Sequence, residues 1–302
     1  MRKLTSLCLL GLLLSACGRL AAAGRATPTS TLAPVHVTTI FATAAAAPAA
    51  TAAAATAPAG LAATPGATGT PAGSAVPGAR PTPSDPLAMP IAASDGATLS
   101  AEYYPPVIAI PVAGQKAPGV LLLEMVGGSR ADWDPFARQL QAQGIAALVL
   151  DFRGQGATAG PADWTKSVDD ARAAWQALLS RPEVDPQRTA LIGASIGANV
   201  ALIVGANNNQ VAAVAALSPG DNFQGIQPGP LLGNFGSRPV YLIASQDDAY
   251  SYASAQHMAP ALASGDTFYY TNAGHGTAMF SNPDLATRLL NWLGVKIGSA
   301  KG

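Results

Sequence analysis

Charged side chains and cysteines are scarce in this 302-residue sequence. Lys, Arg, Asp and Glu make up 11% of the residues, less than half of the roughly 25% that is typical of globular proteins. The formal net charge is zero, which argues against an overall basic nucleic-acid-binding protein. The two cysteines are too few for a disulfide-dense scaffold. The hydrophobic share of 49% is ordinary, so the shortage of charge has to be local.

The N-terminal part of the chain accounts for most of this shortage. Residues 17–86 are mainly Ala, Thr, Pro and Gly, and their only charged members are Arg19, Arg25, Arg80 and Asp85. Prolines recur through this stretch and interrupt every long helical run. Few large apolar side chains are present to offset the entropy lost on ordering. We therefore predict a disordered, fairly extended tether over residues 17–86.

The first residues have the features of a secretion signal. Arg2 and Lys3 precede the apolar run Leu4 to Leu14, which is too short for a membrane-spanning helix and has the length of a signal-peptide core. The following Leu-Ser-Ala-Cys17 resembles a bacterial lipobox, in which the cysteine is acylated and becomes the new N-terminus. The resemblance implies a signal peptide over 1–16 and an extracytoplasmic protein anchored to the bacterial cell membrane by lipid on Cys17. The alternative is an ordinary secretory signal in which Cys17 is incidental.

Residues 87–302 alternate between buried-strand and helical patterns, after a predicted hairpin whose turn is 94–97. We predict buried strands at 119–126, 145–150, 189–193, 211–217, 240–244 and 267–270. The predicted helices are 134–143, with Asp132 as its cap, 168–179, 196–204, 252–262 and 283–293. This alternation indicates an α/β domain with a largely parallel sheet, in which functional side chains gather at the carboxyl ends of the strands.

A serine follows one of these strands in the sequence Gly193-Ala-Ser195-Ile-Gly197. Gly-x-Ser-x-Gly is a weak pattern by itself, but here it joins a predicted strand directly to a predicted helix. This is the setting of a nucleophile elbow, where a sharp turn presents the serine and the glycines allow strand and helix to approach closely. The start of the helix also directs backbone N–H groups toward an oxyanion beside Ser195.

With this elbow, the domain resembles the α/β-hydrolase superfamily, in particular its lid-less carboxylesterase and dienelactone-hydrolase-like branch. The resemblance implies a nucleophile, an acid and a histidine in that order along the chain. The strand beginning at Val240 leads to Asp247 and Asp248, and Asp248 is the better match to the acid of the superfamily. Asp247 remains an alternative because a shift of one residue moves the carboxylate to the other face of an extended segment. Ser245 stands where the superfamily usually has glycine.

Three histidines are candidates for the general base. His36 lies in the predicted tether, and His257 lies inside a predicted helix, where we expect a packed or surface role. His275 lies between glycines in a predicted turn after the last strand. We therefore predict that His275 is the base, with the acid fixing its tautomer.

The resemblance also implies an oxyanion hole formed by two backbone N–H groups. One is that of Ile196, and the other comes from the loop after the first central strand, where Met125 is our choice and Val126 the alternative. Glu124 stands where the superfamily usually has His-Gly. Dienelactone hydrolases carry a glutamate in a similar place together with a cysteine nucleophile, which this domain lacks, so we do not expect their activity. In the segment 151–156, which resembles a turn of the superfamily, Gln155 replaces histidine and is expected to shape the turn.

These features predict a serine hydrolase acting on small-molecule or polymeric carboxylic esters. No metal cluster, phosphate loop or dinucleotide fingerprint is recognisable, so we expect no metal or cofactor and no nucleic-acid partner. Only about twenty residues separate the strands 211–217 and 240–244, which predicts that no lid domain covers the site. The alternatives are thioester or peptide cleavage by the same triad, or an inactive binding protein with this fold. The sequence predicts no particular oligomeric state.

Overall fold

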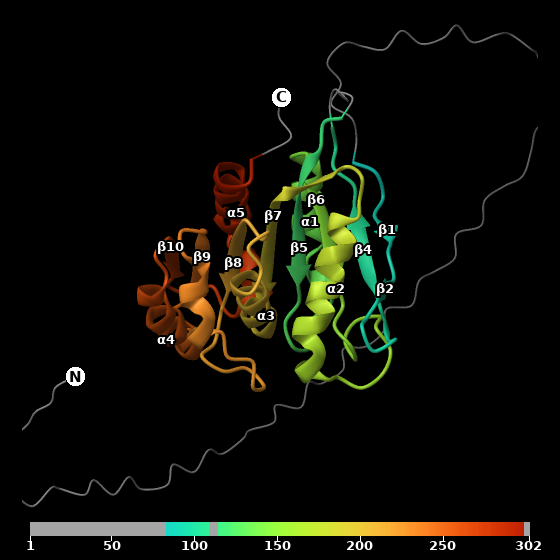
Figure 1. Ribbon diagram of the computed structural model, residues 1–302. Coiled ribbons are helices and arrows are strands. Elements are labelled where there is room, and N and C mark those ends of the chain that lie inside the picture. Colours follow the sequence, from blue (N-terminus) through green and yellow to red (C-terminus); the bar gives the residue numbers. More distant parts are fainter. Residues whose placement is uncertain (1–82, 109–113, 299–302) are drawn as a thin grey trace, which may run out of the picture. The chain divides into compact units, whose positions relative to one another are not determined.

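A mostly parallel eight-stranded sheet forms the centre of the protein in the computed structural model, which describes residues 83–108 and 114–298 (Figure 1). The predicted signal peptide, Cys17 and nearly all of the predicted tether lie outside these residues. In order along the chain, the strands of the sheet are β1 (Leu87–Ala88), β4 (Ala101–Tyr104), β5 (Ala117–Leu123), β6 (Ala146–Leu150), β7 (Val184–Ala194), β8 (Ala213–Leu217), β9 (Val240–Ser245) and β10 (Gly265–Tyr270).

The strands lie in the order β1-β4-β6-β5-β7-β8-β9-β10. Every pair from β6 to β10 is parallel, whereas β1 and β4 pair antiparallel at one edge. Every residue of β5, β6, β8 and β9 is buried, as expected for strands covered on both faces. The prediction of an α/β domain with a largely parallel sheet is therefore confirmed.

Five α-helices cover the two faces of this sheet (Figure 1). On one face, α2 (Ser167–Leu179), α3 (Ile196–Ala206) and α4 (Ala249–Met258) share a core with alternate residues of β5 such as Leu121. On the other, α1 (Asp134–Ala142) and α5 (Pro283–Lys296) pack with the intervening residues, such as Leu122. The alternation follows from the two-residue repeat of a strand. Ten of the eleven residues of α3 are buried, so this helix lies deep in the domain.

The predicted hairpin is confirmed. It consists of β2 (Ile91–Ala92) and β3 (Thr98–Leu99), which pair antiparallel with Ile91 opposite Leu99. The chain is held just before β1 as well, because the buried side chain of Gln141 donates a hydrogen bond to the backbone oxygen of Ser84 at 3.0 Å. The segment between β8 and β9 contains only the 3-10 helix Gly229–Phe235, so no lid domain lies there.

Two local predictions are wrong. Asp132 does not cap α1: its carboxylate accepts the N–H of Ser129 at 2.9 Å, in the 3-10 turn Arg130–Asp132. Pro135 occupies the first turn of α1 and has no N–H there for a cap to bind. The strand predicted over 119–126 ends at Leu123, where its last pairs are with Leu150, the final residue of β6, and with Gly193 of β7.

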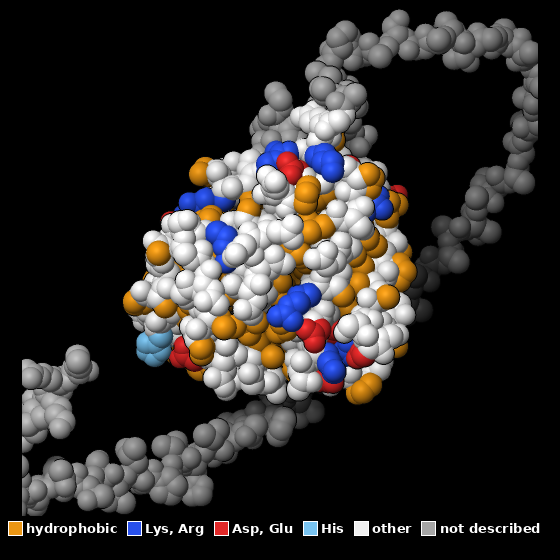
Figure 2. Space-filling view, viewed as in Figure 1, with side chains coloured by type: hydrophobic (Ala, Val, Ile, Leu, Met, Phe, Trp, Pro, Cys, Tyr) orange, Lys and Arg blue, Asp and Glu red, His pale blue; other side chains and the backbone are white. Residues whose placement is uncertain are grey.

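The described surface carries little charge. Figure 2 shows one face of it, with a few charged groups, several of opposite sign side by side, among uncharged side chains. In residues 83–108 and 114–298, no helix combines the length and the apolar character needed to cross a membrane.

Candidate active site

Ser195 occupies a strained turn between β7 and α3. Its backbone angles are φ 54° and ψ −119°, a region that a residue with a side chain rarely adopts and that costs on the order of 1–3 kcal/mol. The Ser195 N–H donates to the oxygen of Leu217 at 2.8 Å, which holds the turn against the end of β8. The strand, turn and helix that the sequence predicts around this serine are therefore present, and the residue is only 6% exposed.

Two glycines permit this turn because other backbone lies against them. A Cβ added to Gly193 would lie 2.0 Å from the oxygen of Gly197, and one added to Gly197 would lie 2.3 Å from the oxygen of Glu124. No real Cβ tolerates such distances, so strand and helix approach as closely as the sequence predicts. The contact with Glu124 also packs the first turn of α3 against the loop after β5.

This contact brings together the loop and the helix start that were expected to supply oxyanion donors. Within the described part of the chain, the N–H groups of Ile196 and Met125 donate no hydrogen bond to a backbone oxygen. The Met125 side chain extends toward the histidine loop, where its sulfur accepts a contact from the Thr277 hydroxyl at 3.7 Å. Val126, the alternative, has the same free N–H but a side chain that is 51% exposed.

Asp248 and His275 form a hydrogen-bonded pair at the ends of β9 and β10. Asp248 Oδ2 lies 2.6 Å from His275 Nδ1, while Oδ1 accepts the N–H of Ser251 at 3.4 Å and so caps α4. Burial acts to raise the pKa of Asp248, but hydrogen bonds from His275 and Ser251 and the charge of His275 together lower it. Asp248 therefore stays ionised and fixes the orientation of the imidazole.

Asp247 binds backbone rather than the imidazole. Its carboxylate contacts the hydroxyl of Ser245 and accepts the N–H groups of Ala273 and Gly274 at 3.2 and 3.1 Å. The hydrogen bond from Ser245 and those from the two N–H groups lower the pKa of Asp247. Of the two aspartates left open by the sequence, the structure thus pairs Asp248 with His275, and Asp247 fastens the histidine loop to β9.

Ser218 also holds this loop, a role that sequence reasoning missed. It follows β8, is completely buried and has φ 51°. Its hydroxyl accepts the N–H of Gly276, the residue after His275, at 2.9 Å, and it helps to lower the pKa of Asp248. A hydroxyl directly after the predicted strand 211–217 was the available signal, since polar groups at the carboxyl ends of parallel strands meet at one edge.

The residues next to Ser195 and His275 in the chain lie close together. A Cβ added to Gly276 would lie 3.5 Å from the Cβ of Ala194, so the histidine loop rests beside the nucleophile turn. Among the described residues no hydrogen bond joins Ser195 Oγ to the imidazole, whose side chain is 40% exposed. Such bonds are often loose without substrate and tighten when it binds.

Glu124 is completely buried beneath this site. One carboxyl oxygen accepts the N–H of Phe152 at 2.7 Å, and the other has no hydrogen-bond partner in the described structure. Burial raises the pKa of Glu124 to about 9, so the group is protonated at neutral pH. An uncharged Glu124 links the loop after β5 to the loop after β6 at no cost of a buried charge.

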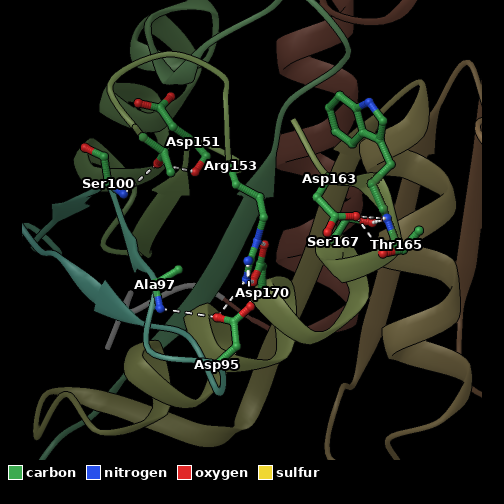
Figure 3. Close-up of polar contacts among 11 residues, drawn as sticks. Asp95, Ala97, Ser100, Asp151, Arg153, Asp163, Thr165, Ser167 and Asp170 are labelled. Atoms are coloured by element: carbon green, nitrogen blue, oxygen red, sulfur yellow. Dashed lines mark hydrogen bonds and ion pairs between the residues drawn. The ribbon is translucent and has the colours of Figure 1, made fainter. Parts of the chain in front are cut away.

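The loop after β6 is tied to its surroundings by ion pairs, some of them drawn in Figure 3. Arg153 bridges Asp170 of α2, with Nε 2.7 Å from a carboxylate oxygen, and Asp95 of the hairpin turn, with Nη1 at 2.7 Å. Gln155 accepts the N–H of Gly127 at 2.7 Å and so joins the turn to the loop after β5. Gln155 was expected to shape its own turn, and in the structure it also holds the loop that carries Met125.

The remaining predicted groups lie elsewhere. His257 is exposed on α4, where Nδ1 lies 3.1 Å from an oxygen of Asp221. Among the residues that the structure describes, no three His, Cys, Asp or Glu side chains form a metal-binding group. His36 and Cys17 lie outside the described residues.

The α/β-hydrolase fold is defined by the sheet order, by the strained serine turn after a central strand, and by the hydrogen-bonded Asp248 and His275 that follow later strands. A family model described as serine aminopeptidase, S33, matches residues 120–233, which include the loop after β5 and Ser195. The esterase of Pyrococcus furiosus, a solved structure, superposes with a TM-score of 0.58 at 20% identity over 71% of this chain and 92% of its own.

Curated relatives match over a shorter stretch. An uncharacterized protein of Mycobacterium tuberculosis is 33% identical over 132 residues, 42% of this chain and 45% of its own. Esterase FrsA of Yersinia pestis is 34% identical over 138 residues, 44% of this chain and 31% of its own. The chain thus spans less than half the length of these relatives. The comparisons support the α/β-hydrolase fold seen in the structure.

Proposed function

We propose that the protein is a serine hydrolase that cleaves carboxylic esters with Ser195 as nucleophile, His275 as general base and Asp248 as the orienting acid. The observation that carries the proposal is the 2.6 Å hydrogen bond from His275 Nδ1 to Asp248, beside a serine held at φ 54° at the start of a buried helix. This combination has the roles that a catalytic triad requires.

The acylation step follows from these positions. Ser195 Oγ attacks the ester carbonyl carbon while His275 Nε2 takes its proton, and Asp248 stabilises the imidazolium that results. The carbonyl oxygen becomes an oxyanion held by the N–H groups of Ile196 and Met125. The bond to the alcohol then breaks, and His275 Nε2 returns the proton to the departing oxygen. The products of this step are the free alcohol and an acyl group on Ser195.

Water completes the cycle through the same groups. His275 takes a proton from a water molecule that attacks the acyl carbon, and the second oxyanion occupies the same pair of N–H groups. Its collapse breaks the bond to Ser195 Oγ, which regains the proton from His275. The carboxylic acid leaves, and no metal or other cofactor is needed for either half of the reaction.

Peptide cleavage is a second candidate because the matching family model is described as a serine aminopeptidase. The same triad can open an amide when His275 protonates the departing amine. Esters are the default because they react more readily and because esterases occur among the relatives and the solved structures. The absence of a lid between β8 and β9 favours exposed or polymeric esters.

A fluorophosphonate probe and short p-nitrophenyl esters test this function. We expect labelling of the folded protein that disappears in Ser195→Ala, and ester turnover that falls to background in the same variant. Ser180→Ala, which removes an exposed serine at the end of α2, is the control and should label fully. Folded protein that neither labels nor turns over any ester would instead favour a binding protein. Faster turnover of aminoacyl amides than of esters would favour the peptidase.

We propose in addition that the protein acts at the outer face of a bacterial membrane, anchored by lipid on Cys17. The lipobox-like sequence and the Ala/Thr/Pro-rich tether support this proposal. Radiolabelled palmitate should be incorporated into the full chain and lost in Cys17→Ala, with Cys8→Ala as the control. Incorporation that survives Cys17→Ala would contradict the anchor.

A further inference from the structure

Phe223 lies beside His275 and Tyr250 lies beside Phe223, and neither side chain has a role in the reaction described above. The ring of Phe223 lies 6.1 Å from the imidazole, edge to face at 79°, and 5.4 Å from the ring of Tyr250 at 69°. Phe223 belongs to the segment after β8, and Tyr250 follows Asp248 by two residues on α4. Tyr250 is 47% exposed and Phe223 is half-buried, so both rings keep surface free for contact.

The segment that carries Phe223 is held from the nucleophile side by Asn199, one turn after Ser195. The buried Asn199 amide donates to the oxygens of Gly220 and Ile226 at 2.7 and 2.8 Å and accepts the N–H of Gly220 at 3.0 Å. Phe223 and Ile226 also pair with each other through two backbone hydrogen bonds, at 3.2 and 2.8 Å. Both polar atoms of the Asn199 side chain thus bind the backbone of the loop 220–226 and fix its shape.

Tyr250 holds the same segment from the other side. Its hydroxyl accepts the N–H of Asn222 at 2.9 Å and donates to the oxygen of that residue at 3.0 Å. The backbone N–H of Asp221 is bound in turn by Ser254 of α4, at 3.0 Å. The two rings are therefore preorganised, so little further ordering is required when a ligand packs on them.

The side of the site on which the rings lie indicates what they contact. His275 has to protonate the oxygen of the departing alcohol, so the group attached to that oxygen lies on the imidazole side. The segments 218–226, 245–252 and 271–277 contain Asp221, Asp247 and Asp248 but no Lys or Arg. Acidic groups without basic partners disfavour an anionic alcohol.

We propose that Phe223 and Tyr250 form a subsite for an uncharged aromatic alcohol, so that the preferred substrates are its esters. This inference rests on the proposed hydrolase function. Aromatic rings favour edge-to-face and offset contacts with one another, and a benzyl or aryl group on the departing oxygen can make such a contact. In the absence of a lid between β8 and β9, the aromatic pair would hold the alcohol end of the substrate.

The test compares kcat/KM for benzyl and ethyl butyrate, whose alcohols are similarly acidic, so that their ratio reports on binding of the ring. We expect the wild type to prefer the benzyl ester by about tenfold or more, and the ratio to fall about tenfold in Phe223→Ala. Phe223→Leu, which keeps apolar bulk and protects the fold, should give an intermediate ratio. Tyr252→Ala is the matched control, since this tyrosine packs on Tyr269 instead, and should keep the wild-type ratio.

Two results would overturn the subsite and differ in what else they overturn. Turnover of both esters with a wild-type ratio near one, or with a ratio that neither Phe223 variant changes, rejects the subsite and leaves the hydrolase intact. Failure to turn over either ester, together with no fluorophosphonate labelling of Ser195, rejects the hydrolase and the subsite with it.

Discussion

Gly276, the residue after His275, donates its backbone N–H to the hydroxyl of Ser218 at 2.9 Å. This contact ties the histidine loop to the end of β8, the same strand end that receives the N–H of Ser195 through Leu217. The end of β8 thus holds both the turn of Ser195 and the loop of His275.

We predict that Ser218→Ala lowers kcat by about tenfold, the effect of losing one hydrogen bond to a buried group, with a smaller change in KM. The imidazole remains present but is less well held. Stopped-flow kinetics with p-nitrophenyl acetate would measure the change. Ser167→Ala is the control, because it removes another buried serine hydroxyl, one that donates to the backbone oxygen of Trp164. It should leave kcat unchanged, and an equal loss in this variant would contradict a specific role for Ser218.

The two aspartates are expected to respond differently. Asp248→Asn should lower kcat by about three to four orders of magnitude, because the imidazole loses the charge that fixes its tautomer. Asp247→Asn should cost less than about tenfold, since the amide oxygen can still accept the N–H groups of Ala273 and Gly274. Steady-state kinetics of both purified variants decide the matter. Equal losses would mean that the pairing of Asp248 with His275 does not determine the activity.

Glu124 predicts how stability changes with pH. The pKa of about 9 in the folded state lies above the ordinary value of 4.5, so the folded protein holds a proton that the unfolded chain releases. The contribution of this group is therefore complete below about pH 4.5 and is lost as pH rises toward about 9. Glu124→Gln has no such proton to release. The difference between its free energy of unfolding and that of wild type should therefore increase, by up to about 1.4 kcal/mol for each unit by which the pH rises.

Urea unfolding at pH 6, 7 and 8 measures this slope. Glu183→Gln is the control. Burial acts to raise the pKa of Glu183, but hydrogen bonds and the charge of Arg181 lower it. Its effect on stability is therefore lost only at acid pH and should be constant from pH 6 to 8. A difference between Glu124→Gln and wild type that is equally constant would show that Glu124 is ionised in the folded protein.

The glycine contacts predict opposite effects of one added methyl group. Gly197→Ala would place a Cβ 2.3 Å from the oxygen of Glu124, so we expect a loss of several kcal/mol in stability or no folded protein. Gly294→Ala, in α5 with open space around it, should gain about 0.5–1 kcal/mol from helix propensity. Thermal unfolding followed by circular dichroism compares the two. A stable, active Gly197→Ala variant would contradict the close packing of the nucleophile turn.

The sequence predicted the elements of the sheet well because their signals are local. The fully apolar strands and the run from Gly193 to Gly197 each depend on a few neighbouring residues. The choice between Asp247 and Asp248 was different, since it depends on where a loop 27 residues further on comes to rest. The position of Ser218 and the pairing of Phe223 with Tyr250 likewise arise from segments that meet only after folding.

The wrong prediction that Asp132 caps α1 had a local cause: the sequence pattern did not distinguish the 3-10 turn from the helix that follows it. Ser129 and Asp132 are both good capping residues, so the sequence offers two possible helix starts. Pro135 has no N–H, and no side-chain hydrogen bond marks the start of α1. The end of β5 at Leu123 instead depends on its neighbours, because its last pairs are with Leu150, where β6 ends, and with Gly193, whereas the largely apolar run continues to Val126. Periodicity alone therefore placed Met125 and Val126 in a strand, although the comparison with the superfamily placed them in a loop.

Every residue from 189 to 202 is buried, so Ser195 lies in the middle of an unbroken protected stretch. Amide hydrogens in such a stretch exchange with solvent mainly when the whole domain unfolds. Because Ser195 lies inside this stretch, we expect its turn to open to solvent only when the domain unfolds as a whole.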